Sequence, residues 1–257
     1  MENTLCMAAK RAKYLLVIIV ILVSIIGLAS FFHHDAQAKE INNFDTRKFN
    51  EVGFTFEELH LFCDIAFGHE KEYLRKWETD IRVQIKNISE QDRYSIAEVD
   101  SVIAILAPLI APLKIERVYS DGNLIVYRNV KQIPETELGE RRSNANGLAR
   151  VGRRAVYSWS IESACIYDCD HSHPHTLMHE FEHALGLEHP SRTYSCYLTI
   201  GRSAVPQYFR SWYQWADYMS QPFYLSEQEK TVIKMLYSPE MKSGLRKDHF
   251  MRQMLLK

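Results

Sequence analysis

The sequence predicts an α+β protein in which helices back a twisted mixed β-sheet. Three observations support this fold class. Segments with an apolar residue at every second position alternate with segments of helical periodicity, which is typical of sheets packed against helices. A histidine-rich helix follows the last strand, and a capped amphipathic helix lies near the C-terminus. The chain has 257 residues, which suits one domain of ordinary size behind a leader.

The first 38 residues have the features of an export signal. Three basic residues precede an apolar run from Tyr14 to Phe32, and Ala36-Gln37-Ala38 forms a small-x-small cleavage site. We expect a secretory signal peptide at 1–38, cut after Ala38. The alternative is an uncleaved signal anchor, because the run approaches the length that spans a bilayer. Both alternatives export the remainder, as a secreted or periplasmic protein or as a domain anchored outside the cytoplasm.

Residues 39–52 are polar and irregular, and we expect a linker there before a compact domain at 53–239. The domain begins with apolar and aromatic residues at helical spacing from Phe54 to Trp77, which predict a helix broken near Gly68. Strict alternation over 81–85 then predicts a strand with one buried face.

A second helix is predicted from Ser95 to Ile110, with Ser95 as its N-cap and Glu98 completing a capping box. Two strands follow, at 115–119 and 123–130. The Ser-Asp-Gly connection between them is typical of a tight turn, so we expect the two strands to pair as a hairpin.

Residues 131–154 are polar and rich in arginine, and we expect a surface excursion. The alternative is a substrate-facing loop that attracts acidic peptides. Residues 155–161 are the next predicted strand. A polar loop at 170–175, containing a proline, is expected to start the helix that follows.

That helix carries the pattern H-E-x-x-H-x-x-G-x-x-H, from His179 to His189. Side chains four residues apart share a helix face, so His179 and His183 can converge on one metal ion. Glu180 lies beside them, where a carboxylate can take a proton from a metal-activated water. A continuous helix would carry His189 to another face, so Gly186, which tolerates a left-handed conformation, must end it. Three histidines with an open fourth position are typical of catalytic zinc, and we expect one Zn²⁺.

This motif resembles that of the metzincin family of zinc peptidases. The resemblance implies a metzincin-like zincin fold over 53–239, with an active-site helix, and a zinc-dependent endopeptidase with Glu180 as general base. It also implies an antiparallel edge strand that holds substrate backbone, at 156–160. A Met-turn at 217–222 would place Met219 beneath the metal as an apolar floor, before a C-terminal helix.

Two positions depart from the family pattern. Glu182 stands where most members have glycine, and it either adds negative charge beside the metal or points outward. Gln221 stands where some members carry an oxyanion-stabilising tyrosine, for which Tyr194, Tyr197 or Tyr218 can substitute. These departures motivate an alternative function, an exported zinc-containing binding or envelope-assembly module without proteolytic activity.

The final helix is predicted to begin at Ser226, with Glu229 completing a capping box, and to end before Pro239. The tail at 240–257 mixes basic and apolar residues. We expect a surface helix or a frayed terminus there, and binding to a partner or to an anionic membrane surface is the alternative.

Four cysteines remain outside the leader, and an even number in an exported protein favours disulfides. Cys165 and Cys169 can bridge locally and leave Cys63 to pair with Cys196, although other pairings fit the sequence as well. The alternative for Cys165 and Cys169 is a second metal site with the histidines of 171–175.

The charge of the chain is nearly balanced, with 31 basic and 32 acidic side chains. This balance argues against nucleic acid as a partner. The expected partners are protein or peptide substrates, and the membrane is contacted only through the N-terminal segment if that segment stays uncleaved. The sequence leaves the oligomeric state open.

Overall fold

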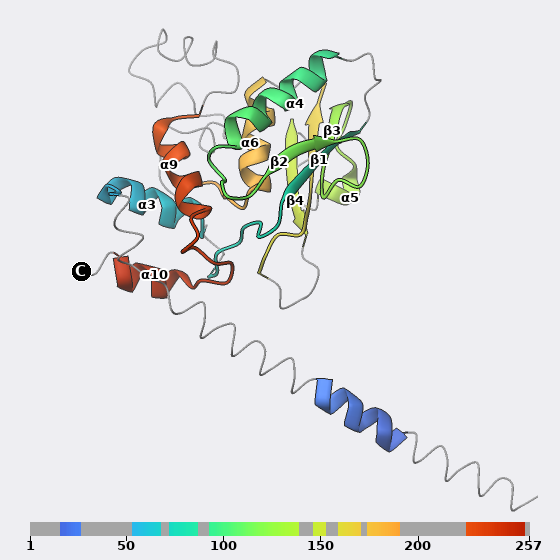
Figure 1. Ribbon diagram of the computed structural model, residues 1–257. Helices are drawn as coiled ribbons and strands as arrows, with labels where there is room; N and C mark the ends of the chain where they lie inside the picture. Colours follow the sequence, from blue (N-terminus) through green and yellow to red (C-terminus); the bar gives the residue numbers. More distant parts are fainter. Residues whose placement is uncertain are drawn as a thin grey trace, which may run out of the picture. The chain divides into compact units, whose positions relative to one another are not determined.

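The computed structural model describes residues 16–26, 53–67, 72–86, 93–138, 146–152, 159–170, 174–190 and 225–254. The chain divides into two compact units, Met1–Asn43 and Phe44–Lys257 (Figure 1). In the first unit, residues 16–26 are helical with exposed side chains. Among the residues just given, no helix is long and apolar enough to cross a membrane. The predicted cleavage site and the predicted linker at 39–52 lie outside them.

A five-stranded mixed sheet forms the centre of the second unit. Its strands are β1 (Ile81–Lys86), β2 (Ile115–Val118), β3 (Leu124–Val130), β4 (Gly147–Gly152) and β5 (Ser163–Cys169). They lie in the order β2-β1-β3-β5-β4, and all are parallel except β4, which pairs antiparallel with β5 at one edge. The predicted α+β class with a mixed sheet is confirmed.

The predicted hairpin of β2 and β3 is wrong, because β1 lies between these two strands. Residues 119–123 instead carry the chain across β1. A Cβ on Gly122 would lie 2.5 Å from the Cβ of Gln84, so the crossing requires glycine at this point. The side chain of Asn123 anchors the crossing, since its Oδ1 accepts a hydrogen bond from the backbone N–H of Arg82 at 2.6 Å. The short connection at 119–123 therefore joins β2 to β3 across β1 and does not form a hairpin turn.

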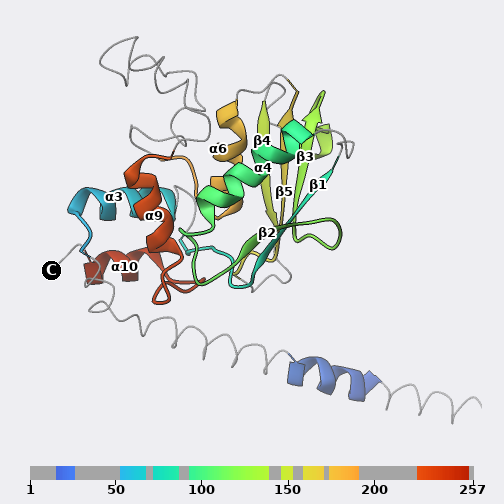
Figure 2. The same ribbon diagram turned by 45° about the horizontal axis from the view of Figure 1, so that its top comes forward.

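Helices α4 (Arg93–Leu106) and α6 (Pro174–Ala184) contact each other and the strands of this sheet (Figures 1 and 2). Alternate side chains of the central strands, including Val83, Val126 and Ile166, are fully buried in the core. Arg128 of β3 forms ion pairs with Glu98 of α4 and Asp168 of β5, and these pairs join the helix to two strands.

Helices α3 (Phe56–Ile65), α9 (Glu227–Leu236) and α10 (Lys247–Met254) form a second helical group. Phe62, Phe67 and Phe250 pack together at its centre, with ring centroids 5.2–5.9 Å apart. The predicted capping box of α9 is confirmed, because the side chains of Ser226 and Glu229 each accept a hydrogen bond from the other residue's backbone N–H.

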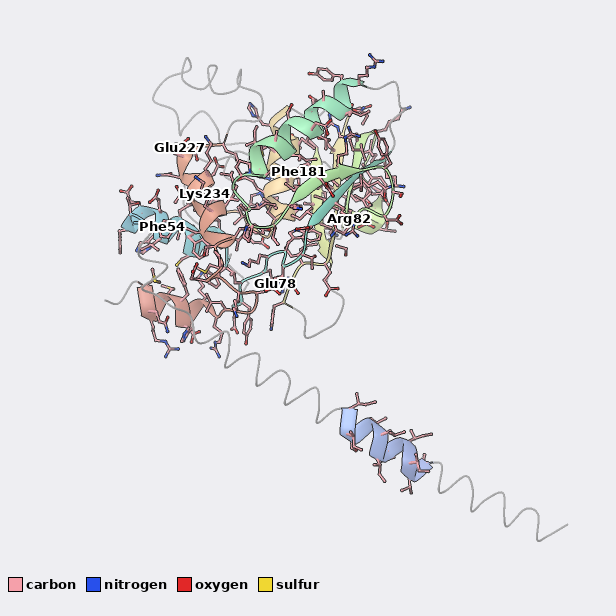
Figure 3. The ribbon with its side chains drawn as sticks, viewed as in Figure 1. Phe54, Glu78, Arg82, Phe181, Glu227 and Lys234 are labelled. Carbon is pink, nitrogen blue, oxygen red and sulfur yellow. The ribbon has the colours of Figure 1, made fainter. Side chains whose placement is uncertain are left out.

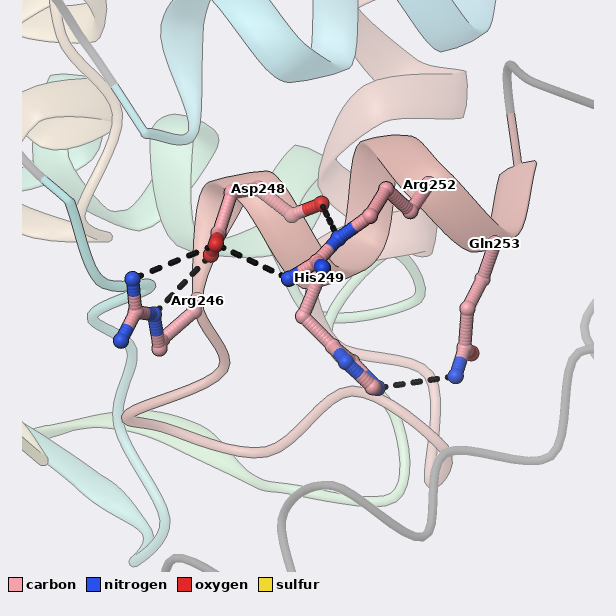
Figure 4. A network of polar contacts seen from close by, with 5 residues as sticks. All are labelled: Arg246, Asp248, His249, Arg252 and Gln253. Atoms are coloured by element: carbon pink, nitrogen blue, oxygen red, sulfur yellow. Dashed lines mark hydrogen bonds and ion pairs between the residues drawn. The ribbon is translucent and has the colours of Figure 1, made fainter.

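Within the tail, residues 247–254 form helix α10, as the helix alternative predicted, whereas residues 240–246 form turns and an isolated bridge. Phe250 of α10 is fully buried against α3. On the outer side, Asp248 accepts hydrogen bonds from Arg246 and Arg252, and His249 contacts Gln253 (Figure 4). Met241 and Leu245 are buried as well, and the backbone of Gly244 and Leu245 hydrogen-bonds to Leu74, so the tail is docked by several contacts.

The two predicted helices of the N-terminal half have different ends from those expected. The first ends at Ile65, and Tyr73 and Trp77 lie in extended segments that form isolated bridges with Arg246 and Ile161. The apolar residues at 73–77 matched helical spacing, but they lie in an extended segment in which Leu74 and Trp77 are buried.

The second helix, α4, begins at Arg93. Ser95 therefore lies inside the helix rather than at its N-cap, and its hydroxyl accepts a hydrogen bond from the Asn129 side chain at 3.0 Å. Glu98 pairs with Arg128. The predicted capping box is wrong, because Ser95 lies inside the helix and Glu98 forms an ion pair with Arg128 instead.

The expected surface excursion at 131–154 contains two regular elements, α5 (Glu135–Leu138) and β4. The strand predicted at 155–161 is not formed in its described part, where Ile161 makes only an isolated bridge with Trp77. Residues 153–158 lie outside the description. The antiparallel edge strand thus precedes the position predicted for it.

Cys63, Cys165 and Cys169 are free thiols. Cys165 and Cys169 lie four residues apart on one strand, which separates their Cα atoms by about 13 Å, whereas a disulfide needs about 7 Å or less. The predicted local bridge is therefore wrong. Burial raises the pKa of the Cys63 thiol to about 12, and its predicted partner Cys196 lies outside the described residues.

Candidate metal centre

The apolar side of α6 fixes this helix in the core. Leu177, Met178, Phe181 and Ala184 are buried, and the helix packs against β4 and β5. Figure 3 shows Phe181 in the interior of the unit. Because residues four apart share a helix face, His179 and His183 project together. Core packing therefore sets the direction of the first two histidines.

The three histidines of the motif converge. The Nε2 atom of His183 lies 3.1 Å from that of His179 and 3.3 Å from that of His189, and the third distance, between His189 and His179, is 3.2 Å. Ring planes of His179 and His183 cross at 86°. Among the described residues these three form the one cluster able to hold a metal ion. Cys165 and Cys169 therefore take part in no metal-binding cluster with other described residues.

The size of this triangle fits a small tetrahedral ion. Nitrogens bound to zinc at 2.0–2.1 Å in tetrahedral geometry lie about 3.3–3.4 Å apart. The observed separations of 3.1–3.3 Å match this spacing closely. Three ring nitrogens with converging lone pairs repel one another unless a cation lies between them, so the donor set fits a metal such as zinc.

A backbone carbonyl fixes the tautomer of the second histidine. Nδ1 of His183 lies 2.8 Å from the Leu187 carbonyl oxygen. The carbonyl can only accept, so Nδ1 carries the proton and Nε2 keeps its lone pair for a metal. Leu187 belongs to the same turn that brings in His189.

Gly186 ends the helix as the spacing predicts. Its φ is +107°, in the region that favours glycine. The N–H of Gly186 donates to the His183 carbonyl and that of Leu187 to the Glu182 carbonyl, which is the Schellman pattern. A Cβ on Gly186 would lie 2.2 Å from the Arg75 carbonyl oxygen, so close packing also excludes a side chain. This turn brings His189 back to the other two histidines.

Glu180 lies next to the edge strand and is 6% exposed. A Cβ on Gly147, the first residue of β4, would lie 2.7 Å from Glu180 Oε1 and 2.5 Å from Thr176 Cγ2. Glycine at 147 therefore leaves the space that the Glu180 side chain occupies. No local signal in the sequence marks Gly147, because it lies far from the motif and its partner is a tertiary contact.

Glu182 points inward and is fully buried, so the alternative that it points outward is wrong. Neither carboxyl oxygen has a hydrogen-bond partner among the described residues. Burial raises the pKa of this group well above its ordinary value, and the nearby Glu229 carboxylate of α9 raises it further. The neutral acid is thus the favoured form in this environment.

The chain matches no protein-family model and no curated protein. A function must therefore be inferred from the residues themselves. The described residues provide a three-histidine cluster that can hold a metal ion, on a mixed α+β fold. The proposed Met-turn with Met219, the departure at Gln221 and the three candidate tyrosines all lie outside those residues.

Proposed function

We propose that the chain is an exported zinc-dependent endopeptidase of the metzincin type. The observation that carries this proposal is the triangle of Nε2 atoms, with separations of 3.1–3.3 Å and the Glu180 residue adjacent in sequence. His179, His183 and His189 would hold the zinc ion through neutral imidazoles, which suit this metal. The apolar run near the N-terminus supports export.

A bound zinc ion would supply Lewis-acid activation of water and of the scissile carbonyl. Glu180 would take the proton from the attacking water and return it to the leaving amine. The space beside Gly147 lets the Glu180 side chain lie between the helix and the edge strand. The largely buried position of this carboxyl strengthens its interactions with charge, because little water surrounds it.

We assign substrate binding to β4, in place of residues 156–160. β4 ends the sheet order and runs antiparallel to β5. The N–H of Cys169 donates to the carbonyl of Asn146, so residue 146 faces β5 with its backbone groups. In an antiparallel pair, this orientation alternates from residue to residue. The odd-numbered residues of β4 therefore direct their N–H and C=O groups away from β5. A peptide added along this edge would use these groups and pass beside Glu180.

The proposal is tested with wild type and Glu180→Ala. Metal content and cleavage of a peptide library are measured for both proteins. Wild type is expected to bind one zinc and to cleave peptides in a chelator-sensitive manner, whereas Glu180→Ala should retain zinc and lose at least about 100-fold in kcat/KM, since the general base is removed.

Undiminished cleavage by Glu180→Ala would disprove the mechanism. Zinc binding without cleavage by wild type would instead favour the alternative, an exported zinc-containing binding or envelope-assembly module. The buried Glu182 beside the histidines is the structural feature that sets this chain apart from the usual family pattern.

A further inference from the structure

The turn after α6 leaves five carbonyl groups that need donors, at residues 181–185. The first three are satisfied locally, by the N–H groups of Leu185, Leu187 and Gly186. The remaining two, those of Ala184 and Leu185, have no local donor because the chain has left the helix. Their donors come from side chains far away in the sequence.

Trp77 and Tyr237 supply these two donors. The indole N–H of Trp77 donates to the Ala184 carbonyl at 2.8 Å, and the hydroxyl of Tyr237 donates to the Leu185 carbonyl at 2.9 Å. Both bonds are buried. A buried carbonyl without a partner costs about 1–3 kcal/mol. Each of the two aromatic donors therefore stabilises the turn by avoiding this cost.

The two aromatic residues are also bound to each other. The backbone of Trp77 hydrogen-bonds to Tyr237 and lowers its pKa, but the larger effect of burial raises that pKa above its ordinary value. The hydroxyl therefore keeps its proton and remains a donor. Trp77 and Tyr237 are 0% and 2% exposed, so water cannot replace either of them.

The same turn carries two parts of the metal centre. Leu187 provides the carbonyl that fixes the tautomer of His183, and His189 follows two residues later. Further contacts hold the turn, since the Arg75 carbonyl lies against Gly186 and the Glu188 N–H donates to the Ile65 carbonyl at 2.7 Å. A displacement of the turn would move His189 and, with it, the carbonyl that orients His183.

We propose that Trp77 and Tyr237 are positioning residues of the metal centre, which hold the turn after α6 so that His183 and His189 present Nε2 at metal-binding spacing. The inference rests on the proposed metal centre but not on proteolysis. Partners that orient metal ligands typically contribute 10–100-fold in metal affinity.

The test uses the full chain with Tyr237→Phe, which removes one oxygen and keeps the ring, and with Trp77→Phe. Zn²⁺ affinity is measured by competition with a chromogenic chelator, and the visible absorption spectrum is recorded with Co²⁺ in place of zinc. We expect each variant to bind Zn²⁺ at least 10-fold more weakly and to show a changed Co²⁺ spectrum. Tyr167→Phe is the matched control, since it removes a tyrosine hydroxyl from the sheet and not from the turn.

Unchanged Zn²⁺ affinity and Co²⁺ spectrum in Tyr237→Phe would overturn the proposal, as would an equal loss in Tyr167→Phe. If Trp77→Phe does not fold, as circular dichroism would reveal, Tyr237→Phe decides alone. Failure of wild type to bind either metal would overturn the metal centre itself, a result distinct from failure of the positioning role.

Discussion

Gly147 allows β4 to approach the helix of the metal centre closely. A Cβ at this position would lie 2.5 Å from Thr176 Cγ2 and 2.7 Å from Glu180 Oε1. Real Cβ atoms do not tolerate such contacts, and both neighbours belong to α6, which is packed on the sheet. The side chain of Glu180 would therefore have to turn away from its present position.

We predict that Gly147→Ala retains Zn²⁺ affinity but lowers kcat/KM by roughly 100-fold, because a displacement of about 1 Å in a catalytic group can cost that much. Peptide cleavage and chelator competition would measure the two effects. Gly152→Ala, at the other end of β4, is the control: its Cβ would meet mainly the Ser163 hydroxyl, which can rotate. Equal losses in both variants would contradict a specific effect on Glu180.

Lys76 is a second residue whose environment has a measurable consequence. Its ammonium group donates to the Ser238 carbonyl and lies over the Tyr237 ring. Burial lowers the pKa of Lys76 from 10.5 to about 8, although Glu78 and Glu240 oppose this change. Between pH 8 and pH 10.5, Lys76 is therefore protonated in the unfolded chain and deprotonated in the folded chain.

In that window the free energy of unfolding is expected to rise with pH, because the unfolded state binds more protons. The cost of burying the charge is present in full below pH 8 and disappears as pH approaches 10.5. Compared with Lys76→Met, wild type should gain about 2 kcal/mol of stability between pH 7 and pH 9.5. Urea unfolding of both proteins at the two pH values measures this difference, and a constant difference would refute it.

Among the elements, β4 has the most direct relation to the proposed activity. It is the antiparallel edge of the sheet, and its first residue lies against Glu180. Ala149 is an odd-numbered residue of this strand, so its N–H is directed away from β5. Proline at 149 would remove that donor without removing a hydrogen bond of the sheet.

We expect Ala149→Pro to raise KM for peptides by roughly 3–10-fold, the effect of one lost hydrogen bond, with unchanged Zn²⁺ affinity. Steady-state kinetics and chelator competition test this prediction. Ala149→Val, which keeps the N–H, controls for the side chain. An unaltered KM in the proline variant would argue that substrate does not bind along β4.

At the scale of the whole molecule, the sequence predicted the parts whose rules are local. The capping box at Ser226 and the positive φ of Gly186 follow from neighbouring residues. The convergence of His179, His183 and His189 also follows, because all three ligands lie within one helix and its turn. Helical periodicity and a glycine suffice to specify that geometry.

The parts that depend on distant contacts could not be predicted. The Ser-Asp-Gly connection has the signature of a hairpin, and only the insertion of β1 between β2 and β3 makes it a crossing. Likewise, Gly147, Trp77 and Tyr237 contact the motif from other segments. A single sequence contains no local pattern that connects them to the histidines.

The crossing of residues 119–123 over β1 also constrains the order in which the domain can assemble. The connection passes so near Gln84 that only a glycine fits. β2 pairs with β1 and with no other strand of the described sheet, so it can join only when β1 is already in place. This is also the order in which the two segments leave the ribosome. A circular permutant that synthesises β1 last would leave β2 without a strand to pair with until synthesis ends.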